Sequence, residues 1–154
     1  MKLQIIQLIT SFLGSLGFAI IFNLKNKHLI VAAIGGLVCW ASYLLTGAFA
    51  SGVFIPSLVA SAVAAFYAEV FARIVKAPAT VIFVSVIIPL IPGSSLFYTM
   101  SNIVSGEIEL FKKYGIETIL FVLGITSGIS IVWSAWYMFQ KLYNIVFKSK
   151  SERV

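Results

Sequence analysis

The chain has few charged residues and no aspartate. Of its 154 residues, 10% are charged and 60% are hydrophobic, whereas about a quarter of the residues in a soluble domain are charged. A helix needs roughly 20 apolar residues to cross the hydrocarbon core of a bilayer. Four stretches, residues 3–22, 28–68, 77–106 and 118–140, contain no Asp, Glu, Lys or Arg. The sequence therefore predicts an all-α protein, a polytopic bundle of transmembrane helices without a soluble domain.

The scarcity of cysteine and histidine argues against disulfide bonds, metal sites and most kinds of catalytic site. Cys39 is the single cysteine and His28 the single histidine, so neither an intrachain disulfide nor a Cys/His metal site is expected. The chain contains no Gly-x-Ser-x-Gly or phosphate-loop pattern. Its serines have no credible base beside them, which nucleophilic catalysis requires. We therefore expect no enzyme activity, no cofactor and no bound metal.

The basic residues lie at the ends of the apolar segments. A net charge of +6 would suggest nucleic acid as the partner of a soluble protein. Here Lys25 and Lys27 follow the first segment, Arg73 and Lys76 end the third, and more lysines follow the last. This is the positive-inside pattern, so we expect no nucleic-acid partner. It predicts a multi-pass protein of the cell (inner) membrane with an external N-terminus, a cytoplasmic C-terminus and an odd number of crossings.

The segments predict about five spans. Residues 1–146 form a single transmembrane domain, and residues 147–154 form a short basic cytoplasmic tail. The predicted helices cover about residues 3–22, 29–45, 53–75, 79–104 and 115–143, with a polar stretch at 107–114.

The fourth span is expected to be broken. Pro89 and Pro92 each lack an amide donor, and proline disrupts the helical turn that precedes it. We expect a half-helix before Pro89, an unwound segment, and a second half-helix from Ser95 that stops at Ser105 and Gly106, because glycine commonly follows a helix end. Whether residues 79–104 span the membrane or form a re-entrant loop is left open.

Small residues recur at a spacing of four in two of the predicted helices. Ala60, Ala64, Ala68 and Ala72 form one row, and Gly124 and Gly128 form a G-x-x-x-G pair. Small residues let helices approach closely in lipid. Both sets are therefore predicted helix contacts, either within the chain or with another subunit.

Two groups of residues are candidates for function. Glu69 and Arg73 lie four residues apart on one helix face, so Glu69 is either half of an ion pair or a protonatable group that couples ion movement to transport. In the second group, the helix that begins at Gly93, Ser94 and Ser95 offers free amides to an anion. Transporters use such half-helix ends to bind substrate carboxylates. Tyr98 and Asn102 share a face with Ser95, which makes these five residues the predicted substrate site. The alternative is a proline kink whose polar groups are satisfied by neighbouring hydroxyls.

Residues 68–80, followed by Ile-Ile-Pro-Leu-Ile-Pro-Gly at 87–93 and Tyr-Thr-Met at 98–100, resemble the threonine/serine exporter family. The chain is most similar to the small membrane subunit of the split exporters. The resemblance implies proton-coupled export of small hydroxylated amino acids together with a larger membrane subunit. It also leaves a dicarboxylate exporter subunit as an alternative, since some split members are linked to dicarboxylates. A non-transporting membrane scaffold or assembly subunit is the other alternative.

Overall fold

The computed structural model describes the backbone of residues 2–151 and the side chains up to residue 142, apart from that of Asn26. All its regular elements are helical: α1 (Lys2–Ile21), α2 (Asn26–Gly47), α3 (Phe54–Val75), α4 (Ala79–Ile87), the 3-10 helix η1 (Ile88–Leu90), α5 (Gly93–Val104) and α6 (Ile108–Ser151).

Four helices, α1, α2, α3 and α6, are long and apolar enough to cross a membrane. Ala79–Leu90 and Gly93–Val104 form a pair bent by 55° that supplies the fifth candidate span. The predicted fold class, a polytopic helical bundle of about five spans with one broken helix, is confirmed.

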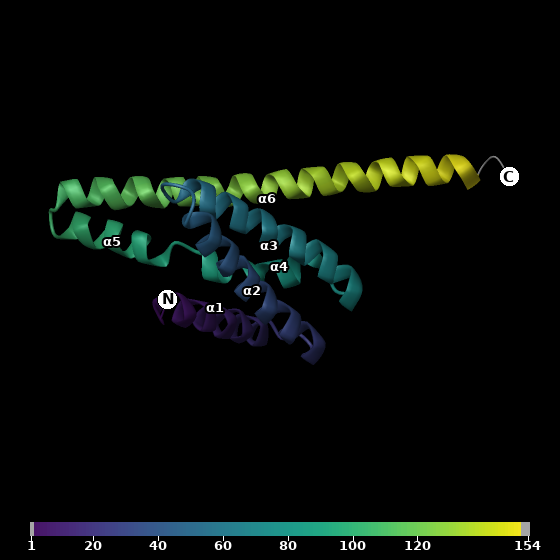
Figure 1. The fold of residues 1–154 in the computed structure, drawn as a ribbon, viewed down its shortest axis with the longest axis horizontal. Helices are drawn as coiled ribbons and strands as arrows, with labels where there is room; N and C mark the ends of the chain where they lie inside the picture. The colour runs from purple at the N-terminus through teal and green to yellow at the C-terminus, as the bar shows by residue number, and fades with distance from the viewer. Residues whose placement is uncertain (1, 152–154) are drawn as a thin grey trace.

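The helices pack in a bundle with one projecting element. The α2 helix lies against α1, α3 and α4, and α6 runs along α3. In contrast, α5 packs against α6 alone, and the two helices form a hairpin that projects beyond one end of the other helices (Figure 1). The residues that follow the break in the fourth span therefore lie outside the main bundle.

Left-handed residues end three of the helices. Asn23 and Lys76 have φ angles of 56° and 55°, and Gly106 has a φ of 75°. At the end of α5 the amide of Glu107 donates to the carbonyl of Asn102, at 2.9 Å, which is the long hydrogen bond of a Schellman motif. The predicted stop at Ser105 and Gly106 is thus confirmed, since glycine adopts positive φ without steric cost.

The last helix is longer than predicted. The stretch at 107–114, expected to be a polar connector, is helical from Ile108, and α6 continues to Ser151. Its 44 residues extend about 66 Å, about twice the thickness of a bilayer core. Charged residues mark where a span leaves the membrane but do not end a helix, and no proline interrupts this one. Part of the predicted tail, residues 147–151, is therefore helical, and residues 152–154 lie outside the described chain.

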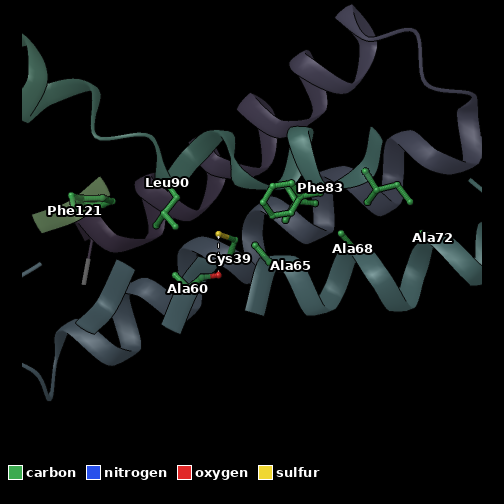
Figure 2. Packing of buried hydrophobic residues seen from close by; sticks show 11 residues of the cluster. Cys39, Ala60, Ala65, Ala68, Ala72, Phe83, Leu90 and Phe121 are labelled. Carbon is green, nitrogen blue, oxygen red and sulfur yellow. Dashed lines mark hydrogen bonds between the residues drawn. The ribbon is translucent and has the colours of Figure 1, made fainter. Parts of the chain in front are cut away.

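The alanine row packs inside the chain. Ala60, Ala64, Ala68 and Ala72 are all buried, in one cluster with Cys39 of α2. Figure 2 places labelled members of this row on α3, facing Cys39 and the side chains of the broken span. The Cys39 thiol donates to the Ala60 carbonyl, with an Sγ–O distance of 3.7 Å. The predicted contact surface is therefore internal.

The glycine pair is also internal. A Cβ atom at Gly124 would meet the side chain of Ser57, and one at Gly128 would meet that of Ser61. Both serines are fully buried on α3. The close approach thus joins α3 to α6 through facing small residues four apart.

The basic connector and the end of α3 lie at one end of the bundle. His28 Nε2 lies 3.2 Å from the carbonyl oxygen of Val75. The carboxyl end of α6 extends in the same direction, whereas the N-terminus lies toward the other end (Figure 1). This arrangement fits the odd number of crossings that the basic residues predict. Which end faces the cytoplasm stays a prediction.

Candidate functional site

The break in the fourth span is shorter than the sequence suggests. Pro89 lacks the amide that would donate to the Ser85 carbonyl, and the chain tightens there into the 3-10 turn Ile88–Leu90. Only Ile91 and Pro92 lie outside a helix before α5 begins at Gly93. The two prolines thus produce a sharp bend with little unwinding.

Two of the three predicted amides at the start of α5 are free. The Gly93 amide donates to the Ile91 carbonyl, with an N–O distance of 2.7 Å. The amides of Ser94 and Ser95 have no acceptor among the described residues. The anion-binding capacity expected for this helix start therefore rests on two donors and on the positive end of the helix dipole.

The polar side chains of Ser95 and Asn102, predicted to complete the site, bond to nearby backbone carbonyls. The Ser95 hydroxyl donates to the Pro92 carbonyl at 3.3 Å, and the Asn102 amide nitrogen donates to the Tyr98 carbonyl at 2.7 Å. Tyr98 is 48% exposed, and its ring stacks on that of Tyr114 in α6, with centroids 5.1 Å apart. At 1.5 Å per residue, Asn102 lies about 10 Å along the axis from Ser95. The structure thus groups residues 93–95 at the break and places Tyr98 and Asn102 further along α5.

Glu69 and Arg73 share a face of α3 but do not form an ion pair. Among the described residues, the salt bridge present joins Lys112 to Glu109. The guanidinium of Arg73 lies over the ring of Trp136 in α6, 4.7 Å from its centroid. When the Gln140 side-chain amide is oriented with its oxygen toward the neighbouring donors, that oxygen accepts hydrogen bonds from Arg73 Nη2 and Trp136 Nε1. Arg73 therefore ties the end of α3 to α6, and Glu69 stays partly buried beside it.

The sequence reasoning missed an open groove on the other side of the break. It measures about 250 Å³ and lies between α1, α2 and η1. Its lining residues are Gln7, Thr10, Ser11, Gly14, Trp40, Ile88 and Pro89. The signal was present in the sequence, because the four α1 residues follow the i, i+3, i+4, i+7 spacing of one helix face. From this polar stripe on an apolar helix, the sequence could have predicted that α1 packs beside the proline break.

A family model described as "Threonine/Serine exporter, ThrE" matches residues 7–135. The chain belongs to the threonine/serine exporter family. The matched region of the chain begins in α1 and ends in α6, so it includes both the open groove and the break. No curated protein and no solved structure matches the chain.

Membership of this family confirms the resemblance carried by residues 68–100. It also supports a transporter type of function and a membrane location for the chain. An enzyme function is not implied by this family.

Proposed function

We propose that this chain is the small subunit of a secondary transporter that exports small amino acids of the threonine/serine type, driven by the proton gradient. The observation that carries the proposal is the broken fourth span in a chain of the exporter family. Secondary transporters place substrate near the bilayer midplane at discontinuous helices. Pro89 and Pro92 lie near the middle of the bent pair, as such a site requires.

The polar surroundings of the break favour transport over a purely structural kink. A scaffold subunit would need only an apolar, lipid-facing bend at these prolines. Instead, the side chains of Gln7, Thr10 and Ser11 line the open groove next to Pro89. Polar groups inside a membrane are costly and generally serve function.

In this proposal the substrate carboxylate docks on the free amides of Ser94 and Ser95. These amides lie at the start of the twelve-residue helix α5, where the dipole favours negative charge. A Cβ added at Gly93 would meet no atom within 4 Å, so the space beside the amides is open to a ligand. Tyr98 and Asn102 would contact the more distant polar groups of the substrate.

Glu69 is the proposed proton-coupling residue. It lies within α3, and no ion pair occupies it among the described residues. Its neighbour Arg73 is held by Trp136 and Gln140 instead. The carboxyl group is therefore available to gain and lose a proton during transport.

A larger membrane subunit of the same family is the proposed partner. The α5 helix packs only against α6 and exposes Phe97, Met100 and Val104, so this chain does not surround the break by itself. The row of alanines and the glycine pair are already used inside the chain. The partner is therefore expected to cover other surfaces, in the cell (inner) membrane and with the C-terminus of this chain cytoplasmic.

Export by cells that carry the chain, the large subunit, both or neither tests the proposal. Threonine and serine efflux is expected only when both are present. Efflux of succinate without threonine or serine would favour the dicarboxylate alternative. Normal threonine efflux without this chain would favour the scaffold alternative, or no role in export.

Substitution of Gly93 tests the docking position. Gly93→Val places a branched side chain beside the free amides and is expected to weaken export of carboxylate-bearing substrates at normal expression. Gly17→Val is a matched control, because a Cβ at Gly17 of α1 also meets no atom within 4 Å. Wild-type export by Gly93→Val would place the carboxylate elsewhere.

A further inference from the structure

Three exposed lysines lie at one end of the bundle, where the connectors of the first four helices meet. Lys25 precedes α2, Lys27 lies in the first turn of α2, and Lys76 caps the end of α3. All three lysines are exposed. His28 links the two connectors, because its Nε2 atom lies 3.2 Å from the carbonyl oxygen of Val75. The three positive charges therefore belong to neighbouring segments at the same end.

Acidic residues do not balance these lysines. Residues 2–68 and 70–106 contain neither Asp nor Glu. Glu69 lies between those stretches, but it is six residues before the end of α3, about 9 Å along the helix axis. In the part of the chain that the structure describes, the salt bridge present joins Lys112 to Glu109. A basic cluster at a membrane surface attracts anionic lipid headgroups, and here no carboxylate competes for the lysines among the described residues.

A second groove, the α1–α4 groove, opens beside the lysines. It has a volume of about 300 Å³. Its lining residues are Phe22, Thr80, Val81 and Val84. Phe22 directly follows α1, three residues before Lys25, and Thr80 is the second residue of α4, four residues after Lys76. All four lining residues are exposed, so a ligand that enters the groove from outside reaches each of them.

The α1–α4 groove is polar at the end near the lysines and apolar beyond it. The amides of Ala79 and Thr80, at the start of α4, have no acceptor among the described residues, and a helix start favours negative charge. From Thr80 to Val84 the groove follows about 6 Å of α4. Because α4 is the first half of the fourth candidate span, the groove runs from the membrane surface inward. A phospholipid has the same arrangement, with its phosphate above its acyl chains.

We propose that the α1–α4 groove binds an anionic phospholipid, with its phosphate at Lys25, Lys27 and Lys76 and one acyl chain between Phe22 and Val84. The apolar lining favours a lipid over a soluble anion, because a soluble anion gains nothing from it. The unbalanced lysines favour an anionic lipid over a zwitterionic one. The bound lipid bridges the end of α1 and the start of α4, a role separate from the proposed export of amino acids.

Lipid competition on the purified full chain in non-ionic detergent micelles tests the site. The probe is radiolabelled phosphatidylglycerol, and the competitors are unlabelled phosphatidylglycerol, phosphatidylcholine and glycerol 3-phosphate. Phosphatidylglycerol is expected to compete about tenfold or more better than phosphatidylcholine, because each lysine near the surface contributes about fivefold to anionic-lipid binding. Glycerol 3-phosphate, which has the phosphate but no acyl chain, is expected not to compete.

Replacement of the lysines tests the contact with the phosphate. Lys25→Gln, Lys27→Gln and Lys76→Gln together are expected to raise the Kd for phosphatidylglycerol about tenfold to 100-fold. The control combines Lys2→Gln, Lys112→Gln and Lys113→Gln, which removes the same charge from the starts of α1 and α6, toward the other end of the molecule (Figure 1). The control is expected to bind as the wild type does, because exposed charges more than a Debye length away are screened.

Filling the α1–α4 groove tests the contact with the acyl chain. Val84→Phe adds an aromatic ring to the groove without a change in charge. It is expected to raise the Kd for phosphatidylglycerol about fourfold or more, the effect of losing roughly one buried methylene. Val122→Phe is the matched control, because Val122 of α6 lies outside this groove and is 44% exposed, against 40% for Val84.

Several outcomes would overturn the lipid site. Equal competition by phosphatidylcholine would show a lipid contact without selectivity, and competition by glycerol 3-phosphate at the same concentration would show a soluble anion only. Wild-type binding by the Lys25/Lys27/Lys76 variant or by Val84→Phe would place the lipid elsewhere. The wild-type chain supplies a further test without any substitution: its Kd is expected to rise between about 0.1 M and 1 M salt, where the Debye length falls from about 10 Å to about 3 Å. An unchanged Kd would contradict the proposal even if the variants failed to fold.

Discussion

A single methyl group at Gly124 should loosen the contact between α3 and α6. A Cβ atom at this position would meet the hydroxyl of Ser57, the carbonyl oxygen of Phe54 at 2.6 Å and the amide nitrogen of Leu58 at 3.2 Å. Two of these three atoms are backbone, which cannot turn aside as a flexible side chain can. Ser57 is fully buried, and its hydroxyl donates to the Phe54 carbonyl at 2.9 Å. The substitution Gly124→Ala therefore forces the two helices apart.

The expected cost follows from that geometry. To bring the 2.6 Å approach to the 3.4 Å of ordinary contact, the helices must separate by roughly 0.8 Å along this line. Overpacking of this kind typically costs about 1–3 kcal/mol. Separation would also weaken the matching contact at Gly128, which faces the backbone and side chains of α3 in the same way. We therefore expect Gly124→Ala to lower the free energy of unfolding by about 1–3 kcal/mol.

The single cysteine provides the assay. Cys39 is fully buried, so a thiol-reactive fluorophore labels it only when the bundle opens. When opening and closing are fast relative to labelling, the labelling rate follows the population of the open state. A loss of about 1–3 kcal/mol then corresponds to labelling about 5- to 150-fold faster. The measurement uses purified protein in detergent micelles, with no residue added to the chain.

Gly17→Ala is the matched control. A Cβ at Gly17 meets no atom within 4 Å, and alanine favours a helix over glycine by roughly 0.8–1.0 kcal/mol. This variant is expected to label at the wild-type rate or more slowly. Equal labelling rates for Gly124→Ala and Gly17→Ala would refute the packing argument.

Three further predictions concern topology, coupling and assembly. Cysteines introduced at Lys25 and Lys148 in a Cys39→Ala background should label from the same side of the membrane, and labelling from opposite sides would overturn the odd crossing number. Glu69→Gln should abolish gradient-driven efflux at a normal membrane level, and a second change of Arg73→Gln should not restore it, because Arg73 is held by α6. Restored efflux in the double variant would instead assign Glu69 a structural role as an ion-pair partner. Purified alone in lipid vesicles, the chain should not move threonine or serine, and robust transport by the single subunit would contradict the proposed partner.

At the predicted substrate site, some structural features could be predicted from the sequence and others could not. The two prolines located the break correctly, because a missing amide acts on the turn that contains it. They could not reveal that the Gly93 amide would find an acceptor in Ile91, since that hydrogen bond depends on how the chain turns after Pro92. The spacing of Ser95 and Asn102 placed them on one helix face. It did not predict that Ser95 would bond to the carbonyl of Pro92, just before the helix, and Asn102 to that of Tyr98 within it.

The sequence by itself determined the membrane class, the spans and two of the chain's turning points. Apolar length, a proline without an amide, and a glycine that tolerates positive φ at Gly106 are properties of single residues and short segments. These local properties have the same effect on the backbone whatever the tertiary contacts of the segment are.

Only the tertiary structure decided which residues contact one another and which polar groups have a partner. It pairs Gly124 with Ser57, places Arg73 on Trp136 rather than on Glu69, and leaves the buried side-chain polar atoms of Ser15, Trp40 and Ser85 without hydrogen-bond partners among the described residues. Residues far apart in the chain come into contact only when the helices pack together. In this bundle the packing depends on close backbone approach at small residues, and the sequence alone would have allowed such an approach between several pairs of apolar helices.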